Sequence, residues 1–390
     1  MKFAFVSHVL PPNWSGQSVV IHRILSGINP DDYCLIAQDY GEADEHRQQK
    51  GRLQAKHYYL PRRLMFMRGW RFALIRWVNI ISRALQIARI IRRENCEAIV
   101  CCPGDFFGLP ASYLASKLTG VKFYPYMLDY YSEQSAGFKS ARFVRRFEPM
   151  IMRGATGIIV PNEFLQDELR ECYGVDSVIV RNPCDVAQYE KEPPFQSNGH
   201  RGEFKIVFTG SIYNAHFDAF RNLLSAIKML DNLNVKLHLY TNQTLDELEK
   251  QGISGPIVLQ GTQETSAMPG IQRQADLLFL PLAFKSPFPK LIRTSAPGKT
   301  GEYLAASRPV LVHAPPDSFL AWYFRQHDCG VVVDESDPVK LAQAIGRILT
   351  DPELQQKLSA NAWERARAEF SIRAAQSAFA KVTGANLIGQ

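Results

Sequence analysis

The stretch PGKTGEYLAASRPV, residues 297–310, contains a helix and the beginning of a strand in one short segment. Pro297 and Gly298 are typical of a helix start, and Arg308-Pro309 is typical of a helix end before a strand. The sequence therefore predicts a helix over residues 298–306, followed by a strand over residues 309–312. A helix that leads directly into a buried strand is one unit of an alternating α/β fold.

The same alternation occurs along the rest of the chain. Apolar runs without a clean two-residue period, each followed by an amphipathic segment, are typical of parallel strands covered on both faces. We predict strands over residues 2–6, 33–37, 98–102, 121–126 and 157–161, and again over 204–208, 235–240, 257–260, 277–281 and 331–333. Other helices are predicted over residues 17–25, 106–118, 143–153, 164–173 and 217–229, with a helical tail over 338–379 that breaks near Ser371.

Two domains are expected, because 390 residues exceed the size of one ordinary domain. The polar stretch NPCDVAQYEKEPPFQSNGHRGEF, which begins at Asn182, is typical of an interdomain linker. We predict two Rossmann-like, doubly wound domains, residues 1–185 and 186–370, with a last helix over about 371–390 that packs back on the first domain. Parallel sheets of this kind bind ligands at the carboxyl ends of their strands, so we expect a ligand cleft between two sets of strand ends.

The composition predicts a cytoplasmic protein. The sequence has no signal peptide cleavage pattern and no apolar run of the roughly 18 residues that would span a bilayer. Its seven cysteines have no metal-ligand spacing, and their odd number favours a reducing compartment over secretion. We expect the protein to be soluble, or to bind the inner face of the cytoplasmic membrane from outside the bilayer.

Positive charge is concentrated in one segment. The formal charge is 45 − 38 = +7, and nine arginines lie between Arg62 and Arg93, with no acidic residue before Glu94. Aromatic and aliphatic residues lie among these arginines, a combination that suits an anionic membrane surface. The alternative is a helix with a core side and solvated arginines, which we favour for its second half. Nucleic acid is not an expected partner, because no known nucleic-acid-binding module is present.

Lys299 and Glu302 are the first candidates for chemistry. They are three residues apart, so a helix places both on one face near its amino end. Unpaired N–H groups at a helix amino terminus attract phosphate, and a lysine adds a full charge. A glutamate one turn further can accept hydrogen bonds from two ribose hydroxyls. The pair therefore suits a nucleoside diphosphate, although a surface ion pair without function is the other interpretation.

The chain resembles the family 4 glycosyltransferases, in which a lysine precedes a Glu-Tyr-Leu-Ala segment and a Pro-Val strand. The loop that ends in Gly16, the Asn182-Pro183-Cys184-Asp185 segment and the run QADLLFLP over residues 274–281 resemble other motifs of that family in the same order. The resemblance implies a GT-B fold, in which the second domain binds a nucleotide sugar and the first domain binds the acceptor. It implies Gly210 and Ser211 as further donor contacts, and Gly16 as a contact of both the donor phosphates and the acceptor.

The chain departs from that family at three positions. Thr294 stands where the family often has the first of two glutamates, and residues 210–216 lack the arginine and lysine that the family places on the diphosphate. Lys290, Arg293 and Lys299 are therefore the expected phosphate ligands. Leu128 stands where a histidine is common, which leaves Asp129 to orient or deprotonate the acceptor, unless it only caps a loop. Glu133 is expected near the acceptor as well.

The resemblance implies a retaining transfer in which the leaving diphosphate accepts the acceptor proton. The protein would supply positioning and charge stabilisation, with Lys299 at the leaving group. No metal and no cofactor other than the nucleotide-sugar substrate are expected. The acceptor is expected to be a glycan, a lipid-linked sugar or a small molecule. Two alternatives stay open: a non-catalytic scaffold that binds sugar nucleotides, and a sugar-nucleotide epimerase of the same fold.

Other phosphate-binding and hydrolytic motifs are absent from the sequence. Gly298-Lys299-Thr300 lacks the glycine that a P-loop requires five residues earlier, where Arg293 stands. No G-x-G-x-x-G follows the first predicted strand, and no G-x-S-x-G is present. Dehydrogenase and serine hydrolase functions are therefore not predicted.

Overall fold

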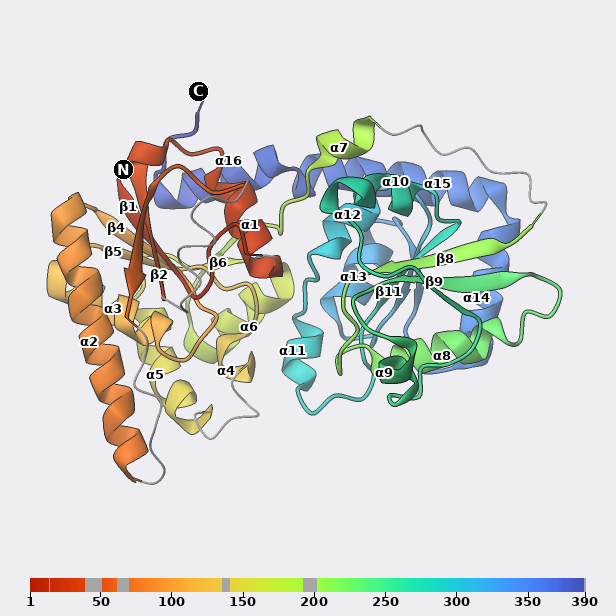
Figure 1. Ribbon diagram of the computed structural model, residues 1–390, viewed down its shortest axis with the longest axis horizontal. Coiled ribbons are helices and arrows are strands. Elements are labelled where there is room, and N and C mark those ends of the chain that lie inside the picture. The colour runs from red at the N-terminus through yellow and green to blue at the C-terminus, as the bar shows by residue number, and fades with distance from the viewer. Residues whose placement is uncertain (14, 39–50, 62–69, 135–140, 192–201, 389–390) are drawn as a thin grey trace. The chain divides into compact units, whose positions relative to one another are not determined.

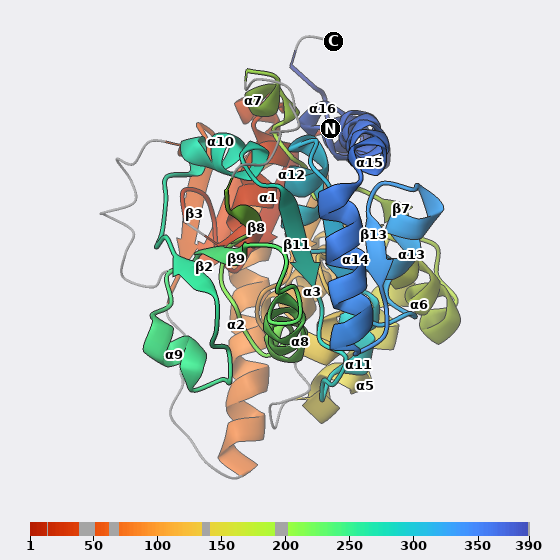
Figure 2. The same cartoon turned by 90° about the vertical axis from the view of Figure 1, so that its right-hand side faces the viewer.

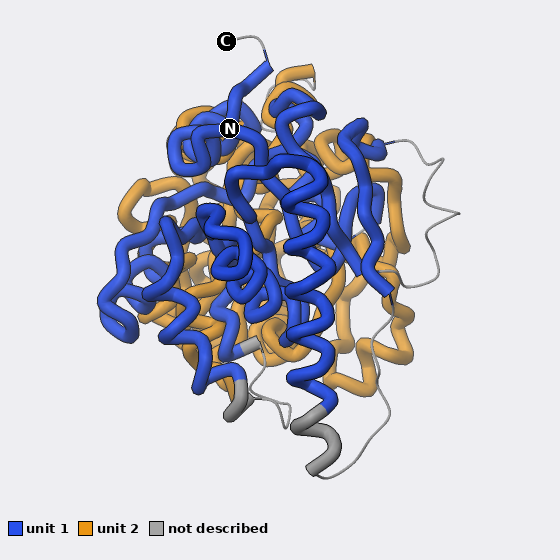
Figure 3. The backbone as a smooth tube through the Cα atoms, turned by 90° about the vertical axis from the view of Figure 1, so that its left-hand side faces the viewer, with its two compact units in different colours: residues 1–183, 372–390 blue, residues 184–371 orange. Residues whose placement is uncertain are grey.

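The structure is a computed structural model that describes the chain except residues 14, 39–50, 62–69, 135–140, 192–201 and 389–390. The chain forms two compact units (Figure 3). Unit 1 consists of Met1–Pro183 and Ile372–Gln390, and unit 2 consists of Cys184–Ser371. Trp14, the first arginines of the basic segment and much of the predicted linker lie outside the described residues.

Unit 1 is built on a parallel sheet. Within the described residues five strands form it, in the order β3-β2-β1-β4-β5. The strands are β1 (Phe3–Ser7), β2 (Tyr33–Gln38), β3 (Lys56–Leu60), β4 (Ala98–Cys102) and β5 (Lys122–Pro125). The order reverses between β1 and β4, so the chain leaves these neighbouring strands towards opposite faces of the sheet. The sequence analysis missed β3, because this edge strand is only partly buried and its KHYYL sequence is largely polar.

Helices cover both faces of this sheet (Figure 1). The unit contains α1 (Gly16–Leu25), α2 (Trp70–Glu94), α3 (Gly108–Thr119), α4 (Tyr131–Gln134), α5 (Ala141–Arg153), α6 (Glu163–Tyr173) and α16 (Ile372–Thr383), and the short paired strands β6 (Ile159–Val160) and β7 (Val178–Ile179). Phe3 and Phe5 point to the face covered by α1 and α16. Ala4 and Val6 point to the face covered by α2, α3, α5 and α6. The two-residue period of β1 thus divides the core of unit 1 into two layers.

The last helix, α16, is part of the core of unit 1. Its Phe379 lies 6.0 Å from the ring of Phe3 and 6.1 Å from the ring of Tyr126, measured between centroids. Gln376 donates a hydrogen bond from Nε2 to the carbonyl oxygen of Arg23 at 2.8 Å. The carboxyl-terminal segment therefore packs on α1, far from it in sequence.

Unit 2 has a second parallel sheet with a matching topology. Within the part of the chain that the structure describes, six strands follow the order β10-β9-β8-β11-β12-β13. They are β8 (Phe204–Thr209), β9 (Val235–Tyr240), β10 (Ile257–Leu259), β11 (Leu277–Pro281), β12 (Val310–His313) and β13 (Val331–Val333). The order reverses between β8 and β11. Two parallel sheets, each covered by helices, confirm the α/β prediction.

The helices of unit 2 include one in the predicted linker. The helices are α7 (Val186–Glu190), α8 (Phe217–Ile227), α9 (Leu245–Glu249), α10 (Met268–Arg273), α11 (Pro289–Arg293), α12 (Lys299–Ala305), α13 (Phe319–Gln326), α14 (Pro338–Thr350) and α15 (Pro352–Arg365). Figure 2 shows α8 and α14 side by side over one face of the sheet. The linker prediction is wrong for α7, because Val186 and Tyr189 are buried in unit 2. The polar composition of this stretch gave no indication that two of its residues, one turn apart, belong to the core.

Candidate functional site

The carboxyl edge of the unit 2 sheet carries most of the predicted donor residues. The sheet order reverses between β8 and β11, and ligands of open parallel sheets bind at such reversals. Gly210 follows β8 directly, and its backbone has a positive φ of 107° that favours glycine. This geometry turns the chain away from the sheet immediately after Thr209.

Helix α12 is fixed against the end of β8 by a buried chain of polar side chains. Thr209 donates its backbone N–H to the hydroxyl of Tyr303 at 3.0 Å. Gln272 donates from Nε2 to Oγ1 of Thr209 at 3.2 Å, and its Oε1 accepts from the hydroxyl of Tyr189 at 2.6 Å. Such a satisfied buried network specifies one arrangement of its elements. It therefore sets the position of Lys299, one turn before Tyr303.

Lys299 brings a cation to the end of β8. A methyl group built on Gly210 would lie 3.5 Å from Nζ of Lys299. The ammonium also lies 3.8 Å from the centroid of the Phe208 ring, a cation–π distance. Burial of the ammonium lowers the pKa of Lys299 to about 7, against the opposing effect of Glu302. In the described part of the chain it makes no ion pair with a carboxylate, so its charge is available to a ligand.

The segment after Gly210 is held by a glutamine. Gln243 accepts the backbone N–H of Ile212 at 2.7 Å and donates to the carbonyl oxygen of the same residue at 2.8 Å. Ser211 is exposed and donates from Oγ to Oδ1 of Asn242 at 3.4 Å. This backbone is therefore fixed while the Ser211 hydroxyl stays at the surface.

His216 is a residue of this site that was not predicted from the sequence. Its ring is buried, lies 4.2 Å from the Tyr213 ring between centroids, and has no hydrogen-bond partner at Nδ1 in the described structure. Burial, with a smaller effect of the nearby Lys299 charge, lowers the pKa of His216 well below its ordinary value. The His216 ring is therefore a neutral group near Lys299. It does not supply the positive charge of the arginine that residues 210–216 lack. The signal that could have identified His216 is its position at the end of a segment rich in small and aromatic residues.

The other predicted donor residues lie on α11 and α12. Glu302 is partly exposed and lies one turn after Lys299, as predicted. Lys290 is exposed and Arg293 partly exposed on α11, the short helix that precedes α12. Thr294 is buried and donates from Oγ1 to the carbonyl oxygen of Lys290 at 2.9 Å, so it ends α11. The structure thus brings Gly210 and Lys299 together and places Lys290 and Arg293 on the neighbouring helix.

The carboxyl edge of the unit 1 sheet has a cluster of its own. Gly16 is exposed and begins α1, whose side-chain cap is Ser15. The next residue, Gln17, donates from Nε2 to Oγ of Ser7 and to the carbonyl oxygen of Cys102, both at 3.1 Å. These two acceptors end β1 and β4, so Gln17 bridges the point where the sheet order reverses.

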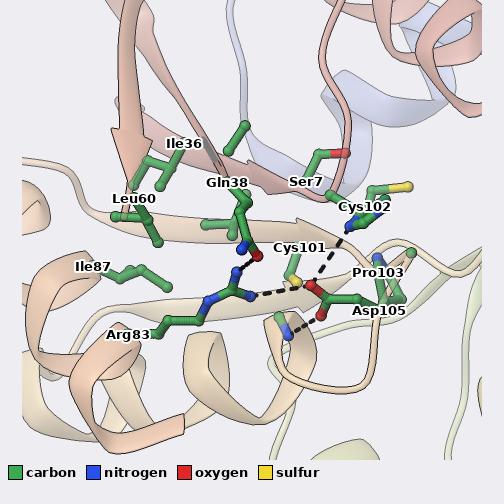
Figure 4. A pocket seen from close by; sticks show the side chains of 15 residues that line it. Ser7, Ile36, Gln38, Leu60, Arg83, Ile87, Cys101, Cys102, Pro103 and Asp105 are labelled. Atoms are coloured by element: carbon green, nitrogen blue, oxygen red, sulfur yellow. Dashed lines mark hydrogen bonds and ion pairs between the residues drawn. The ribbon is translucent and has the colours of Figure 1, made fainter. Parts of the chain in front are cut away.

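A pocket opens beside this bridge (Figure 4). Arg83 of α2 reaches it and donates to Oδ2 of Asp105 at 3.1 Å, and also to Oε1 of Gln38. The side chains of Arg83 and Asp105 are 9% and 8% exposed. His8 lies 3.6 Å from the same carboxylate oxygen. The prediction of solvated arginines is therefore wrong for Arg83, whose charge is compensated inside the unit.

Asp105 also shapes the entry to α3. Its Oδ1 accepts the backbone N–H groups of Phe107 at 2.8 Å and Gly108 at 2.6 Å. A methyl group on Gly104 would lie 2.8 Å from Cβ of His8, so only glycine fits this turn without displacement. The cluster of His8, Arg83 and Asp105 was not predicted from the sequence. A Pro-Gly-Asp turn directly after a buried strand was the signal that could have revealed it.

Asp129 and Glu133 occupy different surroundings in unit 1. Asp129 is partly exposed after β5, and its charge adds to the effect of burial in raising the pKa of the Cys102 thiol well above its ordinary value. Asp129 therefore lies near the end of β4. Glu133, on α4, accepts from Nη2 of Arg145 at 3.1 Å. In the described residues no group of three or more His, Cys, Asp or Glu side chains has an arrangement suited to a metal ion.

Comparisons with known proteins agree with this arrangement. Residues 203–351 match the family described as glycosyl transferases group 1. A glycosyltransferase from Rickettsia africae is similar in structure, with a TM-score of 0.67 and 15% identity over 98% of this chain and 97% of that chain. HepE from Anabaena, in complex with UDP and glucose, has a TM-score of 0.70 and 15% identity over 98% and 99%. WaaG, a glycosyltransferase involved in lipopolysaccharide biosynthesis, has a TM-score of 0.66 and 16% identity over 98% and 100%.

These likenesses establish the fold as GT-B, with two parallel-sheet units. No curated protein matches the sequence. The matched family segment covers the sheet of unit 2 and contains Gly210, Lys299 and Glu302.

Proposed function

We propose that the protein is a glycosyltransferase that moves a sugar, of the hexosyl type, from a nucleoside diphosphate sugar to an acceptor. The observation that carries this proposal is the Lys299 ammonium beside Gly210, at the reversal point of the unit 2 sheet. A cation without a carboxylate partner at this edge has a strong preference for an anionic ligand. The group 1 match over unit 2 and the UDP bound by HepE support a nucleotide diphosphate as that anion.

Each donor residue receives a role under this proposal. Lys299 binds the diphosphate, with Lys290 or Arg293 of α11 as a second cation. The backbone at Gly210 and the exposed hydroxyl of Ser211 lie beside it. Glu302 accepts hydrogen bonds from the ribose hydroxyls. We infer that these groups replace the arginine and lysine that residues 210–216 lack.

We infer a retaining, metal-independent reaction. The bond between the anomeric carbon and the diphosphate oxygen breaks, and the acceptor oxygen bonds to the same face of the sugar. The acceptor proton moves to the leaving phosphate oxygen, while Lys299 stabilises the negative charge that develops there. Analysis of the product anomer by NMR tests this step, and an inverted configuration would refute it.

Unit 1 is the proposed acceptor unit. The first turn of α1 at Gly16, and Asp129 near the end of β4, are the predicted contacts, and Asp129 would orient the acceptor hydroxyl. Glu133 would contact the acceptor only if its ion pair with Arg145 opens. The acceptor class is a glycan, a lipid-linked sugar or a small molecule. We propose a cytoplasmic location, in agreement with the seven free cysteines.

Nucleotide binding is the decisive experiment. Isothermal calorimetry of the purified protein with UDP, GDP, ADP, dTDP and CMP identifies the nucleotide, and Glu302→Ala tests the ribose contact. We expect one nucleotide to bind, and its Kd to rise about tenfold or more in Glu302→Ala, because a charged hydrogen-bond acceptor is lost. Glu364→Ala, on an exposed part of α15 in the same unit, is the matched control and should bind like the wild type.

The negative outcomes are informative as well. Unchanged affinity in Glu302→Ala would remove the proposed ribose contact. Binding of none of the five nucleotides would contradict the transferase proposal and favour a scaffold protein of the same fold. Turnover of the bound nucleotide sugar to an epimer, without any acceptor, would favour an epimerase.

A further inference from the structure

Helix α2 has apolar residues on two faces. Ile80, Ala84, Ile87 and Ile91 are buried in the core of unit 1. Trp77, Val78, Ile81 and Leu85 lie on an adjacent face of the helix and are between 41% and 54% exposed. Folding of unit 1 explains the first group only. Four exposed apolar side chains in three turns of one helix form a contiguous patch, and such patches mark interaction sites.

The patch continues towards α5. The Trp77 ring meets the ring of Phe147 edge to face, with 5.1 Å between centroids. Met150 lies one turn after Phe147 on α5 and is 50% exposed. We call Trp77, Val78, Ile81, Leu85 and Met150 together the α2–α5 surface.

The exposed charges on the described parts of the two helices are positive, and one of them, Arg145, is paired with Glu133 of α4. Arg89, Arg92 and Arg93 are exposed on the last turns of α2, and Arg145 and Arg146 are exposed on α5. The acidic side chains on the described parts of these two helices are Glu94 and Glu148, and both are buried. Glu94 is held by Lys2 and Lys56. The exposed face of both helices is therefore apolar and basic.

We propose that the α2–α5 surface docks on an anionic lipid membrane. Apolar side chains would enter the region between headgroups and acyl chains, while the arginines contact lipid phosphates, as on interfacial amphipathic helices. No helix in the described part of the chain is both long enough and apolar enough to cross a bilayer, so the contact is at the surface. The inference goes beyond the transfer reaction and does not depend on it.

Charge complementarity favours lipid over the other occupants. In a symmetric dimer through this surface, like charges would face each other, because an isologous interface pairs a patch with itself. Nucleic acid would suit the arginines but would leave the five apolar side chains of the surface in contact with phosphate and water. An anionic bilayer satisfies both parts of the surface at once.

Vesicle flotation tests the proposal with the full-length protein. The probes are vesicles of phosphatidylcholine alone and vesicles that contain phosphatidylglycerol as well, each at low and high salt. The test variant is Ile81→Glu/Leu85→Glu, at positions 46% and 54% exposed. The matched control is Leu245→Glu/Val339→Glu in unit 2, at positions 45% and 51% exposed, which adds the same charge elsewhere. Thermal melting shows that each variant is folded.

We expect the wild type and the control to float with phosphatidylglycerol vesicles at low salt. The Ile81→Glu/Leu85→Glu variant should bind at least about tenfold more weakly, because it loses apolar insertion and gains negative charge. Arg89→Glu/Arg146→Glu should weaken binding by about fivefold or more per residue and reduce the salt dependence. These two results together would establish the surface.

Other results would overturn the proposal. Equal flotation of the test and control variants would place membrane binding elsewhere. Equal binding to both vesicle types would exclude a role for the arginines. A wild type that does not float, but forms a dimer or an RNA complex that the Ile81→Glu/Leu85→Glu variant loses, would assign the surface to that partner. Because flotation needs no nucleotide, none of these outcomes bears on the proposed transfer.

Discussion

Each unit places a positive side chain at the carboxyl edge of its sheet, near the point where the strand order reverses, and the two units treat its charge in opposite ways. In each sheet the strand order reverses once, and polar side chains gather at the carboxyl ends on either side of that point. In unit 1, Arg83 is buried against Asp105 and Gln38. In unit 2, Lys299 lies over the Phe208 ring and beside Gly210, with no carboxylate bound to it in the described residues.

From this difference we infer that the charge of Arg83 stabilises the fold, whereas the charge of Lys299 binds a ligand. A buried ion pair with its hydrogen bonds made is complete without a ligand, and removal of one partner leaves an unpaired charge. A desolvated lysine ammonium without a carboxylate partner is costly in the free protein, and its pKa falls as a result. The positive charge in the unit 1 pocket is therefore compensated by Asp105, whereas the positive charge at the unit 2 sheet edge has no carboxylate bound to it in the described residues.

The largest expected effect is a loss of unfolding free energy when the ion pair of Arg83 and Asp105 is broken. Asp105→Asn keeps the acceptor for the backbone of Phe107 and Gly108 but leaves the charge of Arg83 buried without a counter-charge. We expect unit 1 to lose about 3–5 kcal/mol of unfolding free energy. Urea unfolding at neutral pH measures this change.

A control substitution and a rescue variant test whether the loss of stability comes from the unpaired charge. Asp167→Asn removes a carboxylate from an exposed pair with Arg170 and should cost less than about 1 kcal/mol. Arg83→Met/Asp105→Leu removes both charges and should recover much of the stability. If Asp105→Asn costs no more than the exposed control, the two units do not differ as described.

The second effect is on ligand affinity in unit 2. Lys299→Met removes the uncompensated charge, so the Kd for the bound nucleoside diphosphate should rise between about tenfold and 100-fold. The same change should leave the unfolding free energy of the free protein unchanged or higher, because a buried charge is removed. Calorimetry and thermal melting measure the two quantities.

Lys250→Met, at an exposed position that ends α9 in the same unit, is the control and should alter neither quantity. A loss of stability in Lys299→Met with unchanged affinity would make Lys299 a structural residue like Arg83, and the contrast between the units would disappear.

The sequence predicted the unit 2 site better than the unit 1 site, for a physical reason. Lys299 and Glu302 lie in one short helix, so helical spacing alone places them on one face. Arg83 and Asp105 are 22 residues apart on different elements. Only the packing of α2 on the sheet brings them together, and no local pattern reports that contact. The alternation of strands and helices could be predicted for the same reason as the Lys299 site, because both depend on local periodicity.

The errors along the chain have related causes. Strand β3 lies at a sheet edge and buries little, so its sequence lacks the apolar run that identifies the inner strands. Helix α7 has two buried residues within a polar stretch. Helix α13 was not predicted from the sequence, because five of its eight residues are buried and its first six residues, FLAWYF, have no polar face. Position in the fold decides these cases, and position is not encoded in a short window of sequence.

The smallest expected effect is a pH dependence confined to unit 2, and it is the most specific to Lys299. The pKa of Lys299 is lowered to about 7 in the free protein, chiefly by burial, so the ammonium loses its proton as the pH rises through that value. A bound diphosphate favours the charged form and raises the pKa again. Binding above pH 7 must therefore take up a proton, and affinity should fall by up to about tenfold per pH unit between about pH 7 and 9.

Calorimetry in buffers of different ionisation enthalpy measures the proton uptake directly. Lys299→Arg keeps the charge but does not titrate in this range, so it should bind with little pH dependence. Equal pH profiles in the wild type and Lys299→Arg would show that the Lys299 ammonium is already stabilised without a ligand, as Arg83 is.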